Sequence, residues 1–253
     1  MRFLKTSALR LVFFFSLGLV VFQGCKKETE DFNAPKFSEY YPLQVGKYIT
    51  YRLDSTVYIN LNTQKVVRTY TVRDLVDAEI TDNLGRKAYR IRRLMQNPNN
   101  PDQWVDNAVF VVTPQDKSVE MVDNNQRSIK LKEPLKEGFS WMGNSFISDT
   151  DESFFAFMAA WEFIYEWVDL PYNLGSLEFD ETLSVLQADD TLGDPDDKRF
   201  YYQIEKSSEV YAKGIGLIYK DFLFEAWQPA DINNPGFYNP NSFGVRLTYL
   251  NHN

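Results

Sequence analysis

From Tyr40 onward, apolar and polar residues alternate with a period of two far more often than with the helical period of 3.6. β-Branched and aromatic residues are separated by clusters of Asn, Asp, Gly and Pro, which is the pattern of short strands joined by turns. We therefore predict a mainly β fold, an antiparallel curved sheet or half-barrel. The strand candidates are Tyr48–Ile59, Val66–Ile80, Ala88–Met95, Val105–Thr113, Ser118–Val122, Ser128–Leu131, Trp161–Asp169, Thr182–Ala188, Arg199–Ser207, Gly216–Trp227 and Phe243–Leu250.

Two local signals add detail to this sheet. The run Asp82–Gly85 lies between two strand candidates and predicts a hairpin turn. One short helix is predicted over Glu152–Ala160, because Asp149–Asp151 offers an N-cap and an acidic first turn before an apolar run.

A short internal echo indicates how the sheet is organised. The segment Pro42–Tyr48 recurs as Pro134–Trp141, and in both places a proline and a leucine precede a glycine and then an aromatic residue. This order is typical of a chain that enters a strand through a tight corner. We expect a β-rich domain over residues 37–253, which the echo divides into two related halves, 37–130 and 131–253.

The first 25 residues have the pattern of an export signal that ends at the chain's one cysteine. Positive charges precede the uncharged run Leu11–Phe22, which is too short to span a bilayer as a mature helix. Gly24 and Cys25 then resemble the lipobox of bacterial lipoproteins, in which cleavage leaves a cysteine that carries acyl chains. This resemblance implies a signal peptide over 1–24 and a membrane anchor, such as palmitate, on Cys25.

Residues 25–36 are expected to form a flexible tether, because they are charged and lack apolar periodicity. Lys27 followed by Glu28 and Glu30 resembles the export signal of Bacteroidota-type surface lipoproteins. The expected location is the cell outer membrane, and the sequence is compatible with either the periplasmic or the surface-facing leaflet.

Three further motifs resemble those of uncharacterised Bacteroidota-type outer-membrane lipoproteins. They are Tyr41-Pro42-Leu43 with Val45-Gly46, Gly138–Trp141 with Gly143-Asn144, and Tyr211–Tyr219. The resemblance covers most of the chain after the signal peptide, and it implies a cell-envelope location and a fold but no activity. By analogy of architecture, lipocalins and lipoprotein carriers have the same kind of curved sheet.

Composition excludes several classes of function. The chain has 27 Lys and Arg against 35 Asp and Glu; three of the basic residues and no acid fall in residues 1–24, which leaves 24 against 35 and a formal charge of −11. Nucleic acid is a poor partner for such a chain. The one histidine, His252, is next to the C-terminus, and a lipidated Cys25 has no free thiol, which argues against histidine- and cysteine-based catalysis. No cofactor motif is present, since Gly214 and Gly216 precede a strand pattern and predict a tight corner.

The stretch around residue 164 carries the candidate site residues. On a strand, Glu162 and Glu166 lie about 13 Å apart, beyond the spacing that glycosidases use, so we disfavour this carboxylate pair. The same geometry places four aromatic side chains on one face, where they either fill the core or line a surface that stacks on sugars or apolar chains. These are Trp161, Phe163, Tyr165 and Trp167.

Two charged clusters complete the set of candidates. Acidic residues between two strand candidates offer the oxygen ligands that calcium prefers, although solvated acidic turns are commoner. They are Asp189, Asp190, Asp194 and Asp196. A basic cluster is predicted to be a solvated sheet edge, with Arg90 and Arg92 on one face and Lys87 and Arg93 on the other.

Three hypotheses for function follow from these observations. The first is a non-catalytic, lipid-anchored binding or accessory protein, whose ligand is a carbohydrate, an apolar molecule or an envelope protein. The second is a lipid-anchored hydrolase that uses a carboxylate pair from distant strands. The third is a structural or assembly lipoprotein without a ligand, against which an aromatic-lined cavity of about 300 Å³ or more would argue.

Overall fold

The computed structural model describes residues 35–150 and 155–253. Residues 35–253 form one compact unit. The predicted signal peptide, Cys25, and all of the predicted tether except its last two residues lie outside the described residues. No helix in the described part of the chain is long and apolar enough to cross a membrane.

The described chain is mainly β, as the alternation of residues predicts. It begins with one helical turn, α2 (Phe37–Tyr40), and a 3₁₀ turn, η1 (Ala156–Met158), precedes the eighth strand. The strands are β1 (Tyr48–Ile59), β2 (Gln64–Thr81), β3 (Lys87–Asn97), β4 (Asn100–Pro114), β5 (Ser118–Asp123), β6 (Gln126–Lys132), β7 (Ser140–Met142), β8 (Glu162–Leu174), β9 (Leu177–Leu192), β10 (Tyr202–Ala212), β11 (Gly216–Gln228), β12 (Phe237–Tyr238) and β13 (Phe243–His252).

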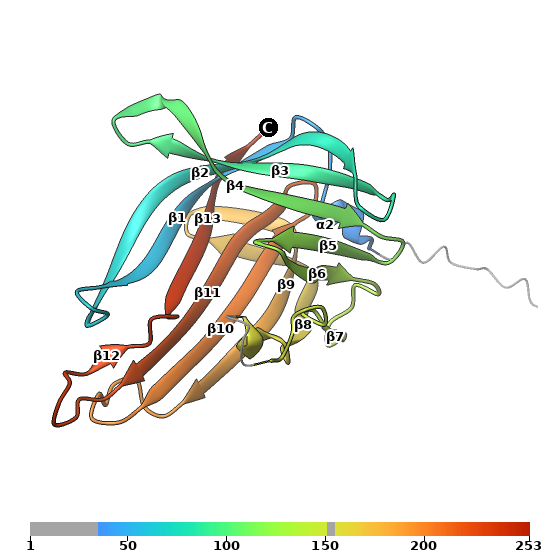
Figure 1. Cartoon of the computed structure of the whole chain (residues 1–253). Helices are drawn as coiled ribbons and strands as arrows, with labels where there is room; N and C mark the ends of the chain where they lie inside the picture. The colour runs from blue at the N-terminus through green and yellow to red at the C-terminus, as the bar shows by residue number, and fades with distance from the viewer. Residues whose placement is uncertain (1–34, 151–154) are drawn as a thin grey trace, which may run out of the picture. The chain divides into compact units, whose positions relative to one another are not determined.

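The strands form one antiparallel sheet in the order β6-β5-β4-β3-β2-β1-β13-β11-β10-β9-β8-β7, with β12 paired to β11. The sheet curves strongly, so that β5 and β6 lie across an interior from β10 and β11 (Figure 1). Its two ends meet, because Ile129 N–H donates to the Gly143 carbonyl (2.7 Å) and the Trp141 ring N–H donates to the Ile129 carbonyl (2.9 Å). The sheet is therefore nearly closed around its core.

The strand order consists of two successive six-strand meanders. β1 to β6 follow one another along the chain and in the sheet, and β7 to β11 with β13 do the same. The meanders are joined where β1 pairs with β13, for example through Leu53 opposite Leu247. The first meander ends at Lys132 and the second begins at Ser140, close to the boundary that the internal echo indicates.

The two echo segments form the same hydrogen-bonded corner, one at the start of each meander. In both, a turn closes on itself, a glycine with positive φ donates to the neighbouring strand, and that strand donates back to the next residue. In the first corner, the backbone N–H of Lys47 donates to Gln44 (3.0 Å), that of Gly46 to Val76 (2.8 Å) and that of Val76 to Lys47 (2.9 Å). In the second corner, the backbone N–H of Phe139 donates to Lys136 (3.0 Å), that of Gly138 to Tyr165 (2.9 Å) and that of Tyr165 to Phe139 (3.1 Å).

Two details of the prediction need correction. Residues 152–154 of the predicted helix lie outside the described residues, and the rest of it contains only the 3₁₀ turn η1. Strands β7 and β12 were not predicted, because segments of three and two residues are too short to show a period. The predicted hairpin is confirmed: Gly85 has a φ of 78°, and its N–H donates to the Asp82 carbonyl at 2.9 Å.

The core lies on the concave side of the sheet and is rich in aromatic residues. Its largest cluster joins both meanders, and α2 packs against it through Phe37 and Tyr40. A separate cluster around Val210 and Ile218 packs on the opposite face of β10 and β11. Both faces of this end of the sheet are therefore covered. Because Val210 lies on the outer face, its neighbours Glu209 and Tyr211 lie on the inner face.

Candidate ligand-binding cavity

A cavity of about 350 Å³ lies within the curved sheet. Its walls are mostly apolar and come from both meanders and from the segments before β1 and β8. Representative wall residues are Tyr41, Tyr51, Phe110, Trp161, Phe163 and Phe222. The volume is within the range of about 300–1,000 Å³ that small-molecule sites occupy.

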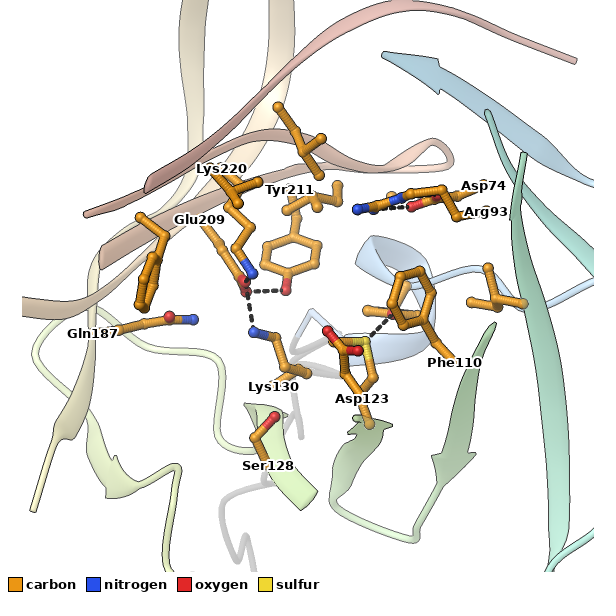
Figure 2. A pocket seen from close by; sticks show the side chains of 18 of the residues that line it. Asp74, Arg93, Phe110, Asp123, Ser128, Lys130, Gln187, Glu209, Tyr211 and Lys220 are labelled. Atoms are coloured by element: carbon orange, nitrogen blue, oxygen red, sulfur yellow. Dashed lines mark hydrogen bonds and ion pairs between the residues drawn. The ribbon is translucent and has the colours of Figure 1, made fainter. Parts of the chain in front are cut away.

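A charged cluster lies on one side of this cavity, around Glu209 of β10. Lys220 of β11 is directly opposite Glu209 in the strand register and lies 3.4 Å from it. Lys130 reaches Glu209 from β6, across the interior, at 2.5 Å. The Tyr211 hydroxyl donates to the other oxygen of the carboxylate at 2.6 Å. Figure 2 shows the three donors converging on Glu209.

Glu209, Tyr211 and Lys130 are buried, and the Lys220 side chain is 24% exposed. Burial by itself would raise the pKa of Glu209, but Lys130, Lys220 and the hydroxyl of Tyr211 outweigh it and lower that pKa to about 2. Burial lowers the pKa of Lys130, and repulsion from Lys220 adds to this, while attraction to Glu209 opposes both. The same carboxylate oxygen of Glu209 thus contacts both lysine side chains, Lys130 at 2.5 Å and Lys220 at 3.4 Å.

A second ion pair lies in the cavity wall. Arg93 of β3 donates two parallel hydrogen bonds, both of 2.7 Å, to the carboxylate of Asp74 on β2. Its guanidinium also lies over the Phe110 ring, 4.9 Å from the centroid. Burial by itself would lower the pKa of Arg93, but the neighbouring Asp74 outweighs it and raises that pKa. The guanidinium therefore stays charged, and Asp74 is its partner.

The Gln187 side chain in the cavity wall is only half satisfied. Gln187 is 5% exposed, and its carbonyl oxygen accepts a hydrogen bond of 2.7 Å from Ser207. Its Nε2 has no hydrogen-bond partner among the described residues. Figure 2 shows this amide directed toward the space beside Lys130 and Glu209. An unsatisfied buried donor costs about 1–3 kcal/mol, so this N–H is a favourable place for an acceptor on a ligand.

Three of the four aromatic side chains predicted to share one face do so: Trp161, which lies just before β8, and Phe163 and Tyr165 within it. Trp161 and Phe163 line the cavity, and Tyr165 is buried beside them with its hydroxyl bonded to the backbone of Lys132. Trp167 is a correction: a bulge between Tyr165 and Trp167 moves it to the opposite face, where it packs near Val210. A bulge adds one residue to the strand, so the side chains after it change face and a period of two no longer predicts their direction.

The carboxylates of β8 lie outside the cavity. Glu162 accepts a hydrogen bond from Ser140 at 2.5 Å, and Glu166 accepts one from Ser184 at 2.7 Å. Both glutamates are exposed and point away from Trp161 and Phe163. They do not form a pair in the cavity.

The acidic calcium candidates do not gather in one turn, which corrects that expectation. Asp189 and Asp190 are part of β9 and pair with β10, whereas Asp194 and Asp196 lie in the following loop. Asp189 is 3.7 Å from Lys206, and the Asp194 carboxylate accepts the backbone N–H of Asp196. Within residues 35–150 and 155–253, no three His, Cys, Asp or Glu side chains are grouped so as to hold a metal ion.

The interpretation of the basic cluster as a solvated sheet edge is wrong. β3 is an interior strand between β2 and β4, and its arginines pair with acids on those strands. Arg90 binds Asp77 and Arg92 binds Asp106 on the exposed face. Arg93 points inward, which places it on the cavity wall.

Sequence reasoning missed the charged residues of the cavity. The signal that was available is local: Glu209 and Lys130 each stand inside a strand pattern whose neighbours are apolar or small. If one face of a strand is assumed to pack on the core, a charged side chain on the other face is predicted to face solvent. The sequence did not reveal that both faces of β10 are covered.

No protein-family model matches the chain, and no curated protein matches it. Among solved structures, the chain is similar to a Vibrio parahaemolyticus domain assigned to outer membrane lipoprotein sorting, with 9% sequence identity and a TM-score of 0.18. The match covers 82% of this chain and 85% of that chain. A TM-score this low supports no conclusion about fold or function.

Proposed function

We propose that this protein is a lipid-anchored, extracytoplasmic binding protein whose β domain holds a small, mainly apolar molecule inside the curved sheet. The observation that carries the proposal is the 350 Å³ cavity with aromatic and aliphatic walls. A cavity of this size with mainly apolar walls is typical of sites that hold small molecules. The cavity favours a mainly apolar ligand, because most of the surface of its wall is apolar.

The role is non-catalytic. Glu209 is held by two lysines and a tyrosine, and its lowered pKa keeps it ionised at neutral pH, so it is a poor proton donor. Glu162 and Glu166 lie outside the cavity. A carboxylate that is matched to lysines stabilises the wall of a binding site and does not need a reaction to explain it.

The anchor supports an envelope location for this binding role. The lipobox-like Gly24-Cys25 and the resemblance to Bacteroidota-type lipoproteins support lipidation of Cys25 and attachment to the outer membrane. A protein fixed to a membrane and carrying an apolar cavity is suited to taking up or delivering molecules that partition into that membrane.

The test uses residues 35–253, which form a compact unit without the anchor. The uncharged dye N-phenyl-1-naphthylamine, which fluoresces in apolar sites, is titrated into the domain. We expect saturable binding that is lost in Ser128→Phe, because Ser128 faces the cavity. Ser176→Phe is the matched control, since Ser176 is exposed in the turn between β8 and β9.

A second measurement does not require a cavity-filling variant. Trp161 lines the cavity, so a brominated lauryl alcohol bound there quenches its fluorescence, and Trp161→Phe removes that part of the quenching. Dye binding that is equal in Ser128→Phe and Ser176→Phe, or quenching unchanged in Trp161→Phe, contradicts the proposal. The third hypothesis, a structural lipoprotein without a ligand, would then be preferred.

A further inference from the structure

We propose that the ligand is an amphiphile with an acidic head group, of the fatty-acid type, whose anionic end lies against Lys130, Lys220 and Gln187 while its apolar part fills the cavity. This inference rests on the proposed binding function and specifies the chemistry of the ligand.

The cluster around Glu209 has more positive than negative groups. Two lysines share Glu209, so the directly bonded group carries one positive charge in excess. The Arg93–Asp74 pair is matched within itself, and Asp123 acts on Lys130 through a longer-range attraction. The cavity lining as a whole has four cationic residues against three anionic ones, which are Lys47, Arg93, Lys130 and Lys220 against Asp74, Asp123 and Glu209. Lys130 is buried and the Lys220 side chain is 24% exposed, so this excess charge is only partly solvated and favours an anion as its partner.

The amide nitrogen of Gln187 is a hydrogen-bond donor beside this charge. The Gln187 side chain is fixed by Ser207, which donates to its carbonyl oxygen, so the amide nitrogen is the end that faces the cavity. That nitrogen has no acceptor among the described residues. A carboxylate has two oxygens and accepts several hydrogen bonds, so it can use the amide and an ammonium together. An alcohol or an amine matches this set of donors less well.

Large apolar side chains lie in the same wall as the cluster. Trp161, Phe163 and Phe222 line the same cavity as Gln187 and Glu209. The cluster around Glu209 is thus one of two charged patches in a wall whose surface is mainly apolar, and that apolar surface is suited to a hydrocarbon chain. A small inorganic anion would satisfy the patch and leave the rest of the cavity unfilled, so the geometry favours an amphiphile.

The experiment compares three ligands with the same hydrocarbon chain on residues 35–253: laurate, lauryl alcohol and laurylamine. Each displaces N-phenyl-1-naphthylamine, and the midpoint gives its affinity. We expect laurate to bind about tenfold more tightly than lauryl alcohol, which corresponds to about 1.4 kcal/mol. Laurylamine is expected to bind most weakly.

The variants locate the head group. Lys220→Met leaves Lys130 and Glu209 as a matched pair, so it removes the excess charge without stranding a buried ion. We expect it to lower the affinity for laurate more than the affinity for lauryl alcohol, so that the two ligands bind about equally. Lys206→Met is the control, because Lys206 is exposed on the neighbouring β10 and pairs only loosely with Asp189.

The outcomes separate this inference from the proposed function. Equal binding of laurate and lauryl alcohol, with both lost in Ser128→Phe, overturns the acidic head group and keeps an apolar-ligand protein. Tightest binding of laurylamine overturns the sign of the charge argument. No displacement by any of the three, together with no cavity-dependent dye binding, overturns both proposals. A preference for laurate that survives Lys220→Met moves the head group away from this cluster and contradicts the inference.

Discussion

Lys130 and Glu209 form a 2.5 Å ion pair across the interior of the sheet, although 79 residues separate them in the chain. Lys130 belongs to the last strand of the first meander, and Glu209 belongs to the second meander. The pair therefore links the two halves of the fold by a polar contact as well as by packing. Lys220 adds a second cation to the same carboxylate, which makes Glu209 the residue on which the cluster depends.

The first prediction concerns removal of that carboxylate charge. Glu209→Gln leaves the buried Lys130 and the partly exposed Lys220 without their anion, so we expect it to lower the free energy of unfolding by about 3–5 kcal/mol. Lys220→Met keeps the matched pair and is expected to cost less than about 1 kcal/mol. Urea unfolding of residues 35–253 measures both. Equal losses in the two variants would show that Glu209 does not balance the two lysines.

The second prediction is the pH dependence that follows from Glu209. Its pKa is about 2 in the folded protein against 4.5 for an ordinary glutamate, so the carboxylate stabilises the fold above pH 4.5. This contribution, about 3 kcal/mol, is lost as the pH falls from 4.5 toward 2. The urea midpoint of the native domain should therefore drop more steeply over this range than that of Glu209→Gln. Parallel curves for the two proteins would be incompatible with the lowered pKa.

The strands were predictable because their information is local. Alternation of side chains, glycine turns and the Pro-Leu-x-x-Gly echo all act within a few residues, and β1 has the bounds that the pattern predicts. The echo also predicted a repeated corner, which Gly46 and Gly138 form with equivalent hydrogen bonds.

The cavity was not predictable, because it depends on which distant strands meet. Nothing near Lys130 in the sequence indicates that Glu209 will lie opposite, and the outward pointing of Trp167 depends on a bulge without a sequence signature. Polar residues that alternate with apolar ones usually face solvent, but both faces of β10 are covered, so Glu209 faces the cavity instead. Local patterns therefore gave the framework, and long-range packing determined the site.

The third prediction tests whether the two corners are equivalent. Gly46 and Gly138 have φ angles of 93° and 75°, and a Cβ on either would meet nothing within 4 Å. Alanine at each position should cost about 1–2 kcal/mol, from backbone strain alone. Gly46→Asn and Gly138→Asn should cost less, because asparagine tolerates positive φ. Thermal or urea unfolding of the four variants provides the comparison, and a neutral alanine at either corner would argue against the shared geometry.

The fourth prediction concerns packing at the cavity wall. A Cβ on Gly143 would collide with the ring of Phe163, which lines the cavity. Gly143→Ala should therefore destabilise the domain by about 1–3 kcal/mol through overpacking. The double variant Gly143→Ala/Phe163→Leu provides the space and should recover part of this loss. If the double variant is no more stable than Gly143→Ala, the clash is not the cause.

The last prediction addresses the anchor, which lies outside the described residues. The lipobox-like sequence predicts that Cys25 carries acyl chains, and several chains hold a protein on a membrane essentially permanently. The full chain should fractionate with outer membranes, and Cys25→Ala should release it into the soluble fraction. Radiolabelled palmitate added to growing cells should label the native chain and not the variant. A Cys25→Ala protein that still sediments with membranes would mean that some other feature holds it there, and the delivery role proposed for the cavity would need a different route to the lipid.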